Sequence, residues 1–167
     1  MATFTWNNGE VKEGLEVTQV YGVIFTTDGR VMLRVEDKPN GKRVYSLAGG
    51  TPEDYDADRV ATLKRELVEE VNTTIFEPIL VGYCEVDEEN GKPPYAQVRM
   101  TAMINEILEK QPDPATGDTY DRLLTTPEKA IELLKWGDSG KLLIEEAVRI
   151  AKENLGLTNF VDFDEYV

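Results

Sequence analysis

Three glutamates gather on one patch of a predicted helix. Glu66, Glu69 and Glu70 belong to the segment 65–72, which reads RELVEEVN. Positions three and four apart are neighbours on a helix, so the three carboxylates fall within an arc of about 100°. Like charges at this spacing destabilise an isolated helix by about 0.2–0.5 kcal/mol per pair, whereas a hard divalent cation would use the same carboxylates as ligands. The patch is therefore the first candidate for chemistry.

The residue types that the chain lacks narrow that chemistry. It has no histidine and a single cysteine, Cys84. These absences exclude histidine-based acid–base catalysis, a Ser-His-Asp nucleophile, an internal disulfide and an ordinary zinc site. Any hydrolysis must depend on carboxylates, hydroxyls, lysine, arginine, tyrosine or metal-bound water.

Charge and composition set expectations about partners. A net charge of -14 opposes binding to polymeric nucleic acid or to an anionic membrane, because both attract clustered Lys and Arg. A small anionic substrate stays compatible if a metal ion neutralises the acidic patch locally. No apolar stretch approaches the roughly 20 residues of a membrane helix, and the N-terminus lacks the features of a secretory signal. We expect a single cytoplasmic domain over 1–167.

The helix that carries the patch has clear ends. Asp56 or Asp58 can cap its beginning, and Asn72 follows its last turn, where a left-handed residue stops a helix. Its apolar stripe is centred about 100° from the acidic arc, so the carboxylates flank the buried face. The stripe consists of Val60, Leu63, Leu67 and Val71.

Strands and turns precede this helix. Segments 17–26 and 31–35 are apolar, β-branched and separated by Asp28-Gly29, which predicts a β-hairpin. A short strand over 44–47 then leads to Gly49-Gly50, just before the helix. The sequence thus places a glycine pair close to the acidic patch.

Further strands follow the helix. Segments 75–86 and 95–107 predict a second hairpin around Asn90-Gly91, and 111–118 is a loop rich in Pro, Gly and Asp. Together with the first hairpin these strands predict a mixed sheet.

The C-terminal third is predicted to be helical. A short helix over 127–134 opens after Thr126, and an amphipathic helix over 139–155 is capped by Asp138 or Ser139. The tail 160–167 mixes aromatic and acidic residues. It is either a frayed, flexible terminus or a segment that packs against the body or another subunit.

The segment 49–73 resembles the signature of the Nudix hydrolases, which is a glycine, five residues, a glutamate, seven residues, then Arg-Glu-apolar-any-Glu-Glu-any-Gly-apolar. Its second half matches at Arg65, Glu66, Leu67, Glu69 and Glu70, while Asn72 and Thr73 replace the last glycine and apolar residue. In the first half, counting back from Arg65 with the family spacing puts Thr51 and Ala57 at the positions where the signature has its glycine and its glutamate. One inserted residue would instead bring Gly50 and Asp56, or Asp58, to the glycine and glutamate positions, with Glu53 as an early loop acid.

The resemblance implies a fold and an activity. The fold would be an α/β/α sandwich around a mixed β-sheet, in the α/β (α+β) class. The activity would be hydrolysis of a pyrophosphate bond in a small-molecule nucleoside diphosphate linked to another moiety, with Mg²⁺ or Mn²⁺ as cofactor. The metal ligands would be Glu66, Glu69 and Glu70, and the carbonyl of Gly49 or Gly50 would complete the shell. Arg65 would hold a signature carboxylate in place.

The proton acceptor and the substrate contacts stay open at this point. Glu69 could deprotonate the attacking water, or a downstream acid could do so, with Glu106, Asp113 and Asp118 as candidates. Other residues could bind the substrate or have ordinary structural roles: Arg99 and Arg122 as phosphate ligands, Tyr120 as a stacking ring. Trp6 and Trp136 are interpreted as packing residues.

Two rival functions belong to other classes. One is a non-catalytic Nudix-fold module that binds a nucleotide or a protein; the other is an acidic interaction protein whose helix matches by chance. The sequence does not identify the substrate among oxidised nucleoside triphosphates, ADP-ribose, dinucleoside polyphosphates and nucleotide sugars. Homodimers are common in the family, and no specific mark of one is present.

Overall fold

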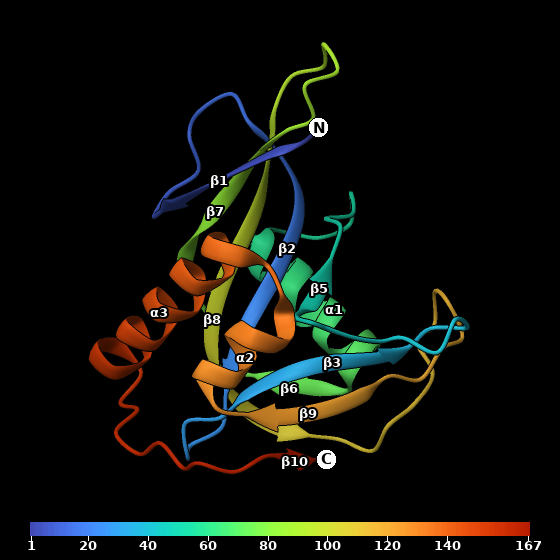
Figure 1. The fold of residues 1–167 in the computed structure, drawn as a ribbon, viewed down its shortest axis with the longest axis vertical. Coiled ribbons are helices and arrows are strands. Elements are labelled where there is room, and N and C mark those ends of the chain that lie inside the picture. The colour runs from blue at the N-terminus through green and yellow to red at the C-terminus, as the bar shows by residue number, and fades with distance from the viewer.

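A computed structural model describes all residues, 1–167, as a curved mixed β-sheet with helices on both faces (Figure 1). The main path of the sheet follows the order β1-β7-β8-β2-β3-β9-β10, while β4, β5 and β6 pair with β3, β2 and β8. The strands are β1 (Thr3–Asn8), β2 (Glu16–Phe25), β3 (Val31–Asp37), β4 (Arg43–Ser46), β5 (Ala48–Gly50), β6 (Thr73–Ile75), β7 (Ile79–Asp87), β8 (Tyr95–Ile107), β9 (Asp121–Thr125) and β10 (Glu165–Tyr166).

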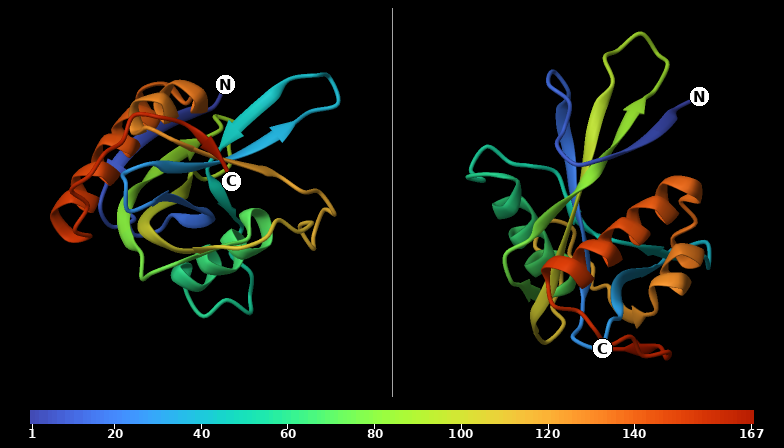
Figure 2. Two further views of the ribbon diagram at one scale, coloured as in Figure 1. Left: turned by 90° about the horizontal axis from the view of Figure 1, so that it is seen from below. Right: turned by 90° about the vertical axis from the view of Figure 1, so that its left-hand side faces the viewer.

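The two faces of the sheet bury separate apolar clusters. Val23 and Phe25 of β2 belong to the cluster beneath α2 (Pro127–Leu134) and α3 (Gly137–Asn154). Val20 and Ile24 of the same strand belong to the cluster beneath α1 (Arg59–Val71). This alternation follows from the two-residue period of a strand. Figure 2 shows the resulting layers, with α1 on one side and α2 and α3 on the other, which confirms the predicted α/β/α sandwich.

The first predicted hairpin is correct only at its turn. Gly29 adopts a φ of +80°, and the amide of Thr26 donates to the carbonyl of Arg30 at 2.9 Å. Beyond the single pair Phe25–Val31 the strands separate, because β2 pairs in parallel with β8 while β3 pairs with β9. The prediction of a two-stranded ladder was therefore wrong, since burial against distant strands decides the pairing.

The second hairpin is confirmed, with one correction. β7 and β8 are antiparallel and meet at the pair Val86–Tyr95. The predicted strand over 75–86 is divided before Ile79, because Pro78 cannot donate to a ladder. Residues 76–78 lie outside the strands, and Ile75 belongs to β6, which pairs with the far end of β8 near Ile107.

Two of the three helices begin at capping residues that the sequence predicted. Asp58 caps α1 by accepting from the amide of Ala61 at 2.8 Å, and Asn72 closes it in the left-handed conformation, with φ 48°. Thr126 caps α2 as predicted. The cap predicted for the last helix was wrong: α3 begins after Trp136 without a side-chain cap, because only two residues separate it from α2.

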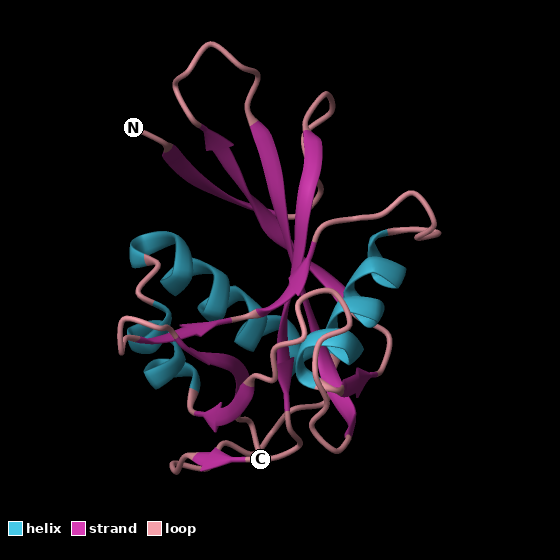
Figure 3. Cartoon of the chain, turned by 90° about the vertical axis from the view of Figure 1, so that its right-hand side faces the viewer, coloured by secondary structure: helices cyan, strands magenta, loops and turns pink.

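The C-terminal tail lies against the body in this structure. β10 pairs with β9, and the amide of Val161 donates to the carbonyl of Asp28 at 3.0 Å. Figure 3 shows this last strand lying beside the sheet, at the end away from the β7–β8 hairpin. None of the helices is both long enough and apolar enough to cross a bilayer.

Candidate active site

Glu66 and Glu69 converge at the beginning of the acidic patch. Both accept a hydrogen bond from the same atom, Nη1 of Arg65, at 2.9 and 3.4 Å. Their side chains keep 14% and 27% of their exposure, so water reaches both. The guanidinium of Arg65 therefore supplies positive charge to both carboxylates.

Glu70 has a different environment. It is buried; its Oε1 accepts from the amide of Gly49 at 2.9 Å, and its Oε2 pairs with Nη1 of Arg34. Burial raises the pKa of Glu70, although Arg34 and the Gly49 amide oppose that shift. Glu70 therefore ties α1 to β3 and β5 in this structure.

The glycine pair allows the backbone to approach these acids. Gly50 lies so close to Glu66 that an added Cβ would fall 2.4 Å from the carboxylate carbon. Gly49 has a φ of +155°, and a Cβ there would fall 2.1 Å from the carbonyl oxygen of Val20. The carbonyl of Gly49 or Gly50 stays a predicted metal ligand; the N–H of Gly49 donates to Glu70.

Arg65 links the loop to the helix. Its Nε and Nη2 each donate to Asp56 at 2.9 Å, and these bonds hold the pKa of Asp56 well below its ordinary value. Asp56 also accepts from the amide of Glu53 and from the hydroxyl of Thr62. Of the two acids considered for the outer signature position, Asp56 thus joins the Arg65 network and Asp58 serves as the helix cap.

The predicted metal ligands do not form a prepared cluster. No group of three or more Asp, Glu, His or Cys side chains is arranged to hold a metal ion. The reason is that Glu66 and Glu69 face Arg65 while Glu70 faces Gly49 and Arg34. The donor chemistry nevertheless suits a hard cation, and burial together with the charges of Glu70 and Glu69 raises the pKa of Glu66. A cation would relieve that crowding.

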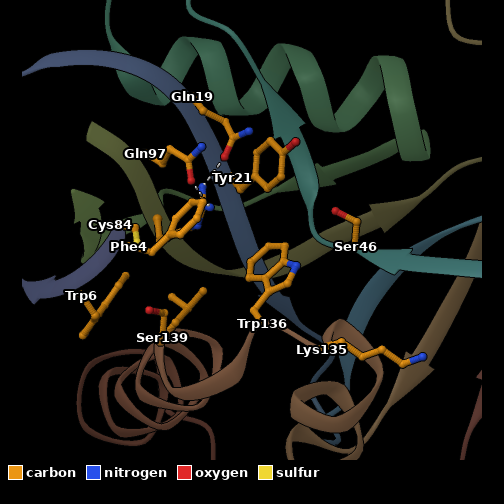
Figure 4. A pocket seen from close by; sticks show the side chains of 12 residues that line it. Phe4, Trp6, Gln19, Tyr21, Ser46, Cys84, Gln97, Lys135, Trp136 and Ser139 are labelled. Atoms are coloured by element: carbon orange, nitrogen blue, oxygen red, sulfur yellow. Dashed lines mark hydrogen bonds between the residues drawn. The ribbon is translucent and has the colours of Figure 1, made fainter. Parts of the chain in front are cut away.

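A pocket of about 490 Å³ lies on the opposite face of the sheet from α1 (Figure 4). Arg99 lies in it, 4.8 Å from the ring centre of Tyr21 and 5.2 Å from that of Trp136. Trp6 also lines the pocket, so both tryptophans pack as predicted and in addition form walls of a cavity. The ring of Tyr21 lies against Gly49, where an added Cβ would fall 2.4 Å from its Cδ1, and Gly49 in turn donates to Glu70, so the pocket adjoins the acidic patch at this point.

Comparison with solved structures is consistent with this architecture. A Nudix hydrolase described as putative, from Listeria monocytogenes, superposes with a TM-score of 0.60 at 20% identity, covering 83% of this chain and 97% of that one. The mutator protein MutT from Bacillus halodurans gives 0.56 at 21% identity, with coverages of 78% and 80%. A pyrophosphohydrolase mutant from Bacillus subtilis gives 0.52 at 16% identity, with coverages of 65% and 63%.

The chain has the Nudix fold. Scans of the sequence against models of protein families and against curated proteins find no match. The likeness therefore lies in the three-dimensional arrangement, at identities too low to carry residue roles from one chain to the other.

Within this Nudix fold, Arg122 has structural contacts instead of the predicted phosphate contact. Its guanidinium donates to the backbone carbonyls of Val71, Leu108 and Val167 at 3.1, 2.6 and 3.0 Å. These bonds hold the end of α1 and the C-terminal tail. Burial lowers the pKa of Arg122.

Tyr120 is likewise not placed as an open stacking surface. It is buried, and the guanidinium of Arg34 lies 4.6 Å from its ring centre. Of the three predicted substrate contacts, Arg99 lines the pocket of about 490 Å³, and Tyr120 and Arg122 do not. The sequence analysis did not identify three other residues that line this pocket: Gln19, Tyr21 and Gln97. The polar residues at 97 and 99, two positions apart on a predicted strand, could have indicated that both side chains lie on one face.

The three downstream acids differ in position. Glu106 and Asp118 are exposed, whereas Asp113 is buried and its charge helps to raise the pKa of Glu70 after the larger effect of burial. Asp113 also folds its own loop, by accepting from the amide of Ala115 at 2.9 Å. Of these candidates, only Asp113 is near the acidic patch.

Proposed function

We propose that this protein is a Nudix-type, metal-dependent hydrolase that cleaves a pyrophosphate bond in a nucleoside diphosphate linked to another moiety. One observation carries the proposal: Glu66 and Glu69 converge beside Gly50 within a Nudix fold. Two of the superposed proteins carry hydrolase names, which supports the same class of reaction.

The proposed cofactor is Mg²⁺ or Mn²⁺. Glu66 and Glu69 would hold it after Nη1 of Arg65 gives up its contacts with them, and Glu70 would join if it released Arg34 or the Gly49 amide. When bound, the metal would neutralise phosphate charge and lower the pKa of a coordinated water. Carboxylate oxygens are the ligands that these cations prefer.

The chain's own residues have distinct proposed roles. Glu69 is the most exposed of the three glutamates, so the carboxylate oxygen that it does not give to the metal is the one placed to accept a proton from the attacking water. Arg65 is a positioning residue, because its bonds to Asp56 fix the loop against α1. Glu70 holds the Gly49 backbone close to the patch.

The test is hydrolysis of a substrate panel with and without Mg²⁺ or Mn²⁺. The panel comprises an oxidised nucleoside triphosphate, ADP-ribose, a dinucleoside polyphosphate and a nucleotide sugar. We expect metal-dependent turnover of at least one of them, and losses of about 100-fold or more in Glu66→Gln and Glu69→Gln, comparable to other single-group catalytic deletions. Glu13→Gln removes an exposed acid in the β1–β2 loop and serves as the control. Equal rates in parent and glutamate variants would contradict the proposal.

One observation favours the non-catalytic alternative: the acids are paired with Arg65 and Arg34 and form no prepared metal cluster. Under that alternative, nucleotides would bind with the same affinity with and without metal, and no substrate of the panel would turn over. The same assay, read for binding as well as for product, separates the two functions.

A further inference from the structure

Arg99 is a buried cation without a carboxylate partner. Only 6% of its surface is exposed, and no acidic side chain lines its pocket, although the chain contains 32 acids. Burial lowers the pKa of Arg99 to about 10. Removing a charge from water is costly unless an opposite charge compensates it. The pocket therefore carries a positive charge that a ligand could neutralise.

The hydrogen bonds around Arg99 leave donors free for a ligand. Its guanidinium donates to the side-chain oxygens of Gln19 and Gln97 at 2.7 and 3.2 Å, which Figure 4 shows as dashed lines. Because each amide oxygen is used in this way, each of these glutamines has only its NH₂ group, a donor, left for a ligand. These donors and the charge of Arg99 favour a ligand that brings acceptors.

The walls of the pocket are aromatic. The rings of Tyr21 and Trp136 lie 6.5 Å apart between centres, and Phe4 and Trp6 line the same cavity. Phe4 is 55% exposed, so one wall is open to solvent. Flat apolar surfaces next to a few polar groups are typical of sites that bind planar rings.

We propose that this pocket binds a planar ring that carries an anionic group, and that this group compensates the charge of Arg99. The inference rests on the proposed function, because the ring of Tyr21, which lines the pocket, lies against Gly49, and Gly49 donates its N–H to Glu70 of the acidic patch. The ring belongs to a part of the substrate outside the pyrophosphate. Among derivatives that differ only in this part, the pocket favours those that carry a second anionic group there, a phosphate ester or a carboxylate.

Binding is measurable apart from catalysis. Both tryptophans of the chain line the pocket, so intrinsic fluorescence reports its occupation. The titration uses Glu69→Gln in EDTA, with three probes: adenosine for the ring alone, inorganic phosphate for the anion alone, and adenosine 3′-monophosphate for both. We expect adenosine 3′-monophosphate to bind about 10-fold or more tightly than either of the others, as a compensated buried charge requires.

Variants assign that preference to Arg99. Arg99→Met, which keeps bulk without charge, abolishes the preference for the nucleotide over adenosine, and Arg99→Lys keeps part of it. Ser139→Asp leaves Arg99 intact and places a competing anion on the pocket wall, so it also abolishes the preference if Arg99→Met does not fold. Lys92→Gln removes an exposed cation in the β7–β8 turn and leaves binding unchanged.

Three results would overturn the inference: equal affinities for adenosine and its 3′-monophosphate, no fluorescence response to any probe, or an unchanged preference in folded Arg99→Met and Ser139→Asp. Failure here is distinct from failure of the proposed function. Metal-dependent turnover without selective binding would contradict only the role proposed for the pocket. Selective binding without turnover would contradict only the proposed hydrolase activity.

Discussion

At the scale of single residues, Gly50 and Glu66 constrain each other. Gly50 is not needed for its backbone conformation, because its φ is not positive. It is needed because a Cβ at this position would fall 2.4 Å from the Glu66 carboxylate carbon. Any side chain at position 50 must displace that carboxylate or the backbone beside it.

We therefore predict that Gly50→Ala lowers kcat by about 10-fold or more while the fold is retained, because misplaced catalytic groups lose rate steeply. Steady-state kinetics checks the rate and circular dichroism the fold. In the Glu66→Gln background the same substitution should cost little, since both changes act on one carboxylate. Additive losses would show that Gly50 acts through something else.

Asn72 gives a prediction about stability. Its backbone is left-handed, its amide donates to the carbonyls of Leu67 and Val68, and its Nδ2 donates to that of Val68. Asn72→Gly and Asn72→Ala lose the same side-chain bonds, so their difference isolates backbone conformation. The free energy of unfolding should be lower for Ala than for Gly by about 1 kcal/mol. Urea denaturation measures it, and equal values would mean that the helix end rearranges.

Residue-scale features that depend on neighbours in sequence were predictable, and those that depend on distant partners were not. The acid patch, the Asn72 stop and an aspartate cap followed from spacing within one helix. The bond between Glu70 and Arg34 joins residues 36 apart, and Arg122 contacts carbonyls up to 51 positions away. Charge and residue type alone could not distinguish these structural arginines from Arg99.

At the scale of elements, the C-terminal tail is held by a titrating contact. Asp164 accepts from Nζ of Lys129 at 2.5 Å and from the hydroxyl of Thr125 at 2.7 Å. The bond from Lys129, then that from Thr125, lowers the pKa of Asp164 below its ordinary 3.8. Its contribution to tail docking is therefore complete above that value, and it is lost as the pH falls through the lower folded-state pKa.

Pepsin digestion between pH 4 and pH 2 tests this contact, because the tail contains Phe160 and Phe163. Cleavage of the tail, relative to an unstructured reference peptide, should increase as the pH falls. Asp164→Asn should show fast cleavage at every pH. Asp162→Asn, which changes an exposed neighbour, should behave as the parent. A parent tail cleaved equally at all pH values would mean that Asp164 does not hold it.

The sequence predicted whole elements correctly where it has a clear turn between two strands or a regular apolar stripe along a helix. α1, α2 and the β7–β8 hairpin are of this kind. β1 and β9 were missed: β1 is a short, mostly exposed edge strand, and the residues of β9 lie between the predicted loop and the predicted short helix, where no element was assigned. The separation of β2 from β3 could not be read from the turn between them, because it depends on the pairing of β2 with β8.

At the scale of the molecule, 32 acidic and 18 basic side chains leave a charge of -14. Self-repulsion of this size destabilises the compact state, and dissolved ions screen it. We predict that raising NaCl from 20 to 300 mM increases Tm by about 2–4 °C, the shift that about 1 kcal/mol gives for a chain of this length. Calorimetry in EDTA, repeated with KCl, measures it; a lower Tm would mean that surface ion pairs outweigh the repulsion.

The parallel pairing of β2 with β8 also bears on how the chain is made. Thr101 donates its hydroxyl to the carbonyl of Val23, across 78 residues of sequence. A ribosome must therefore synthesise nearly two thirds of the polypeptide before the central ladder can close, and β9 emerges later still. Until then α1 lacks the apolar side chains of β8 that belong to its cluster. A nascent chain stalled before β8 should therefore be susceptible to proteases and dependent on chaperones.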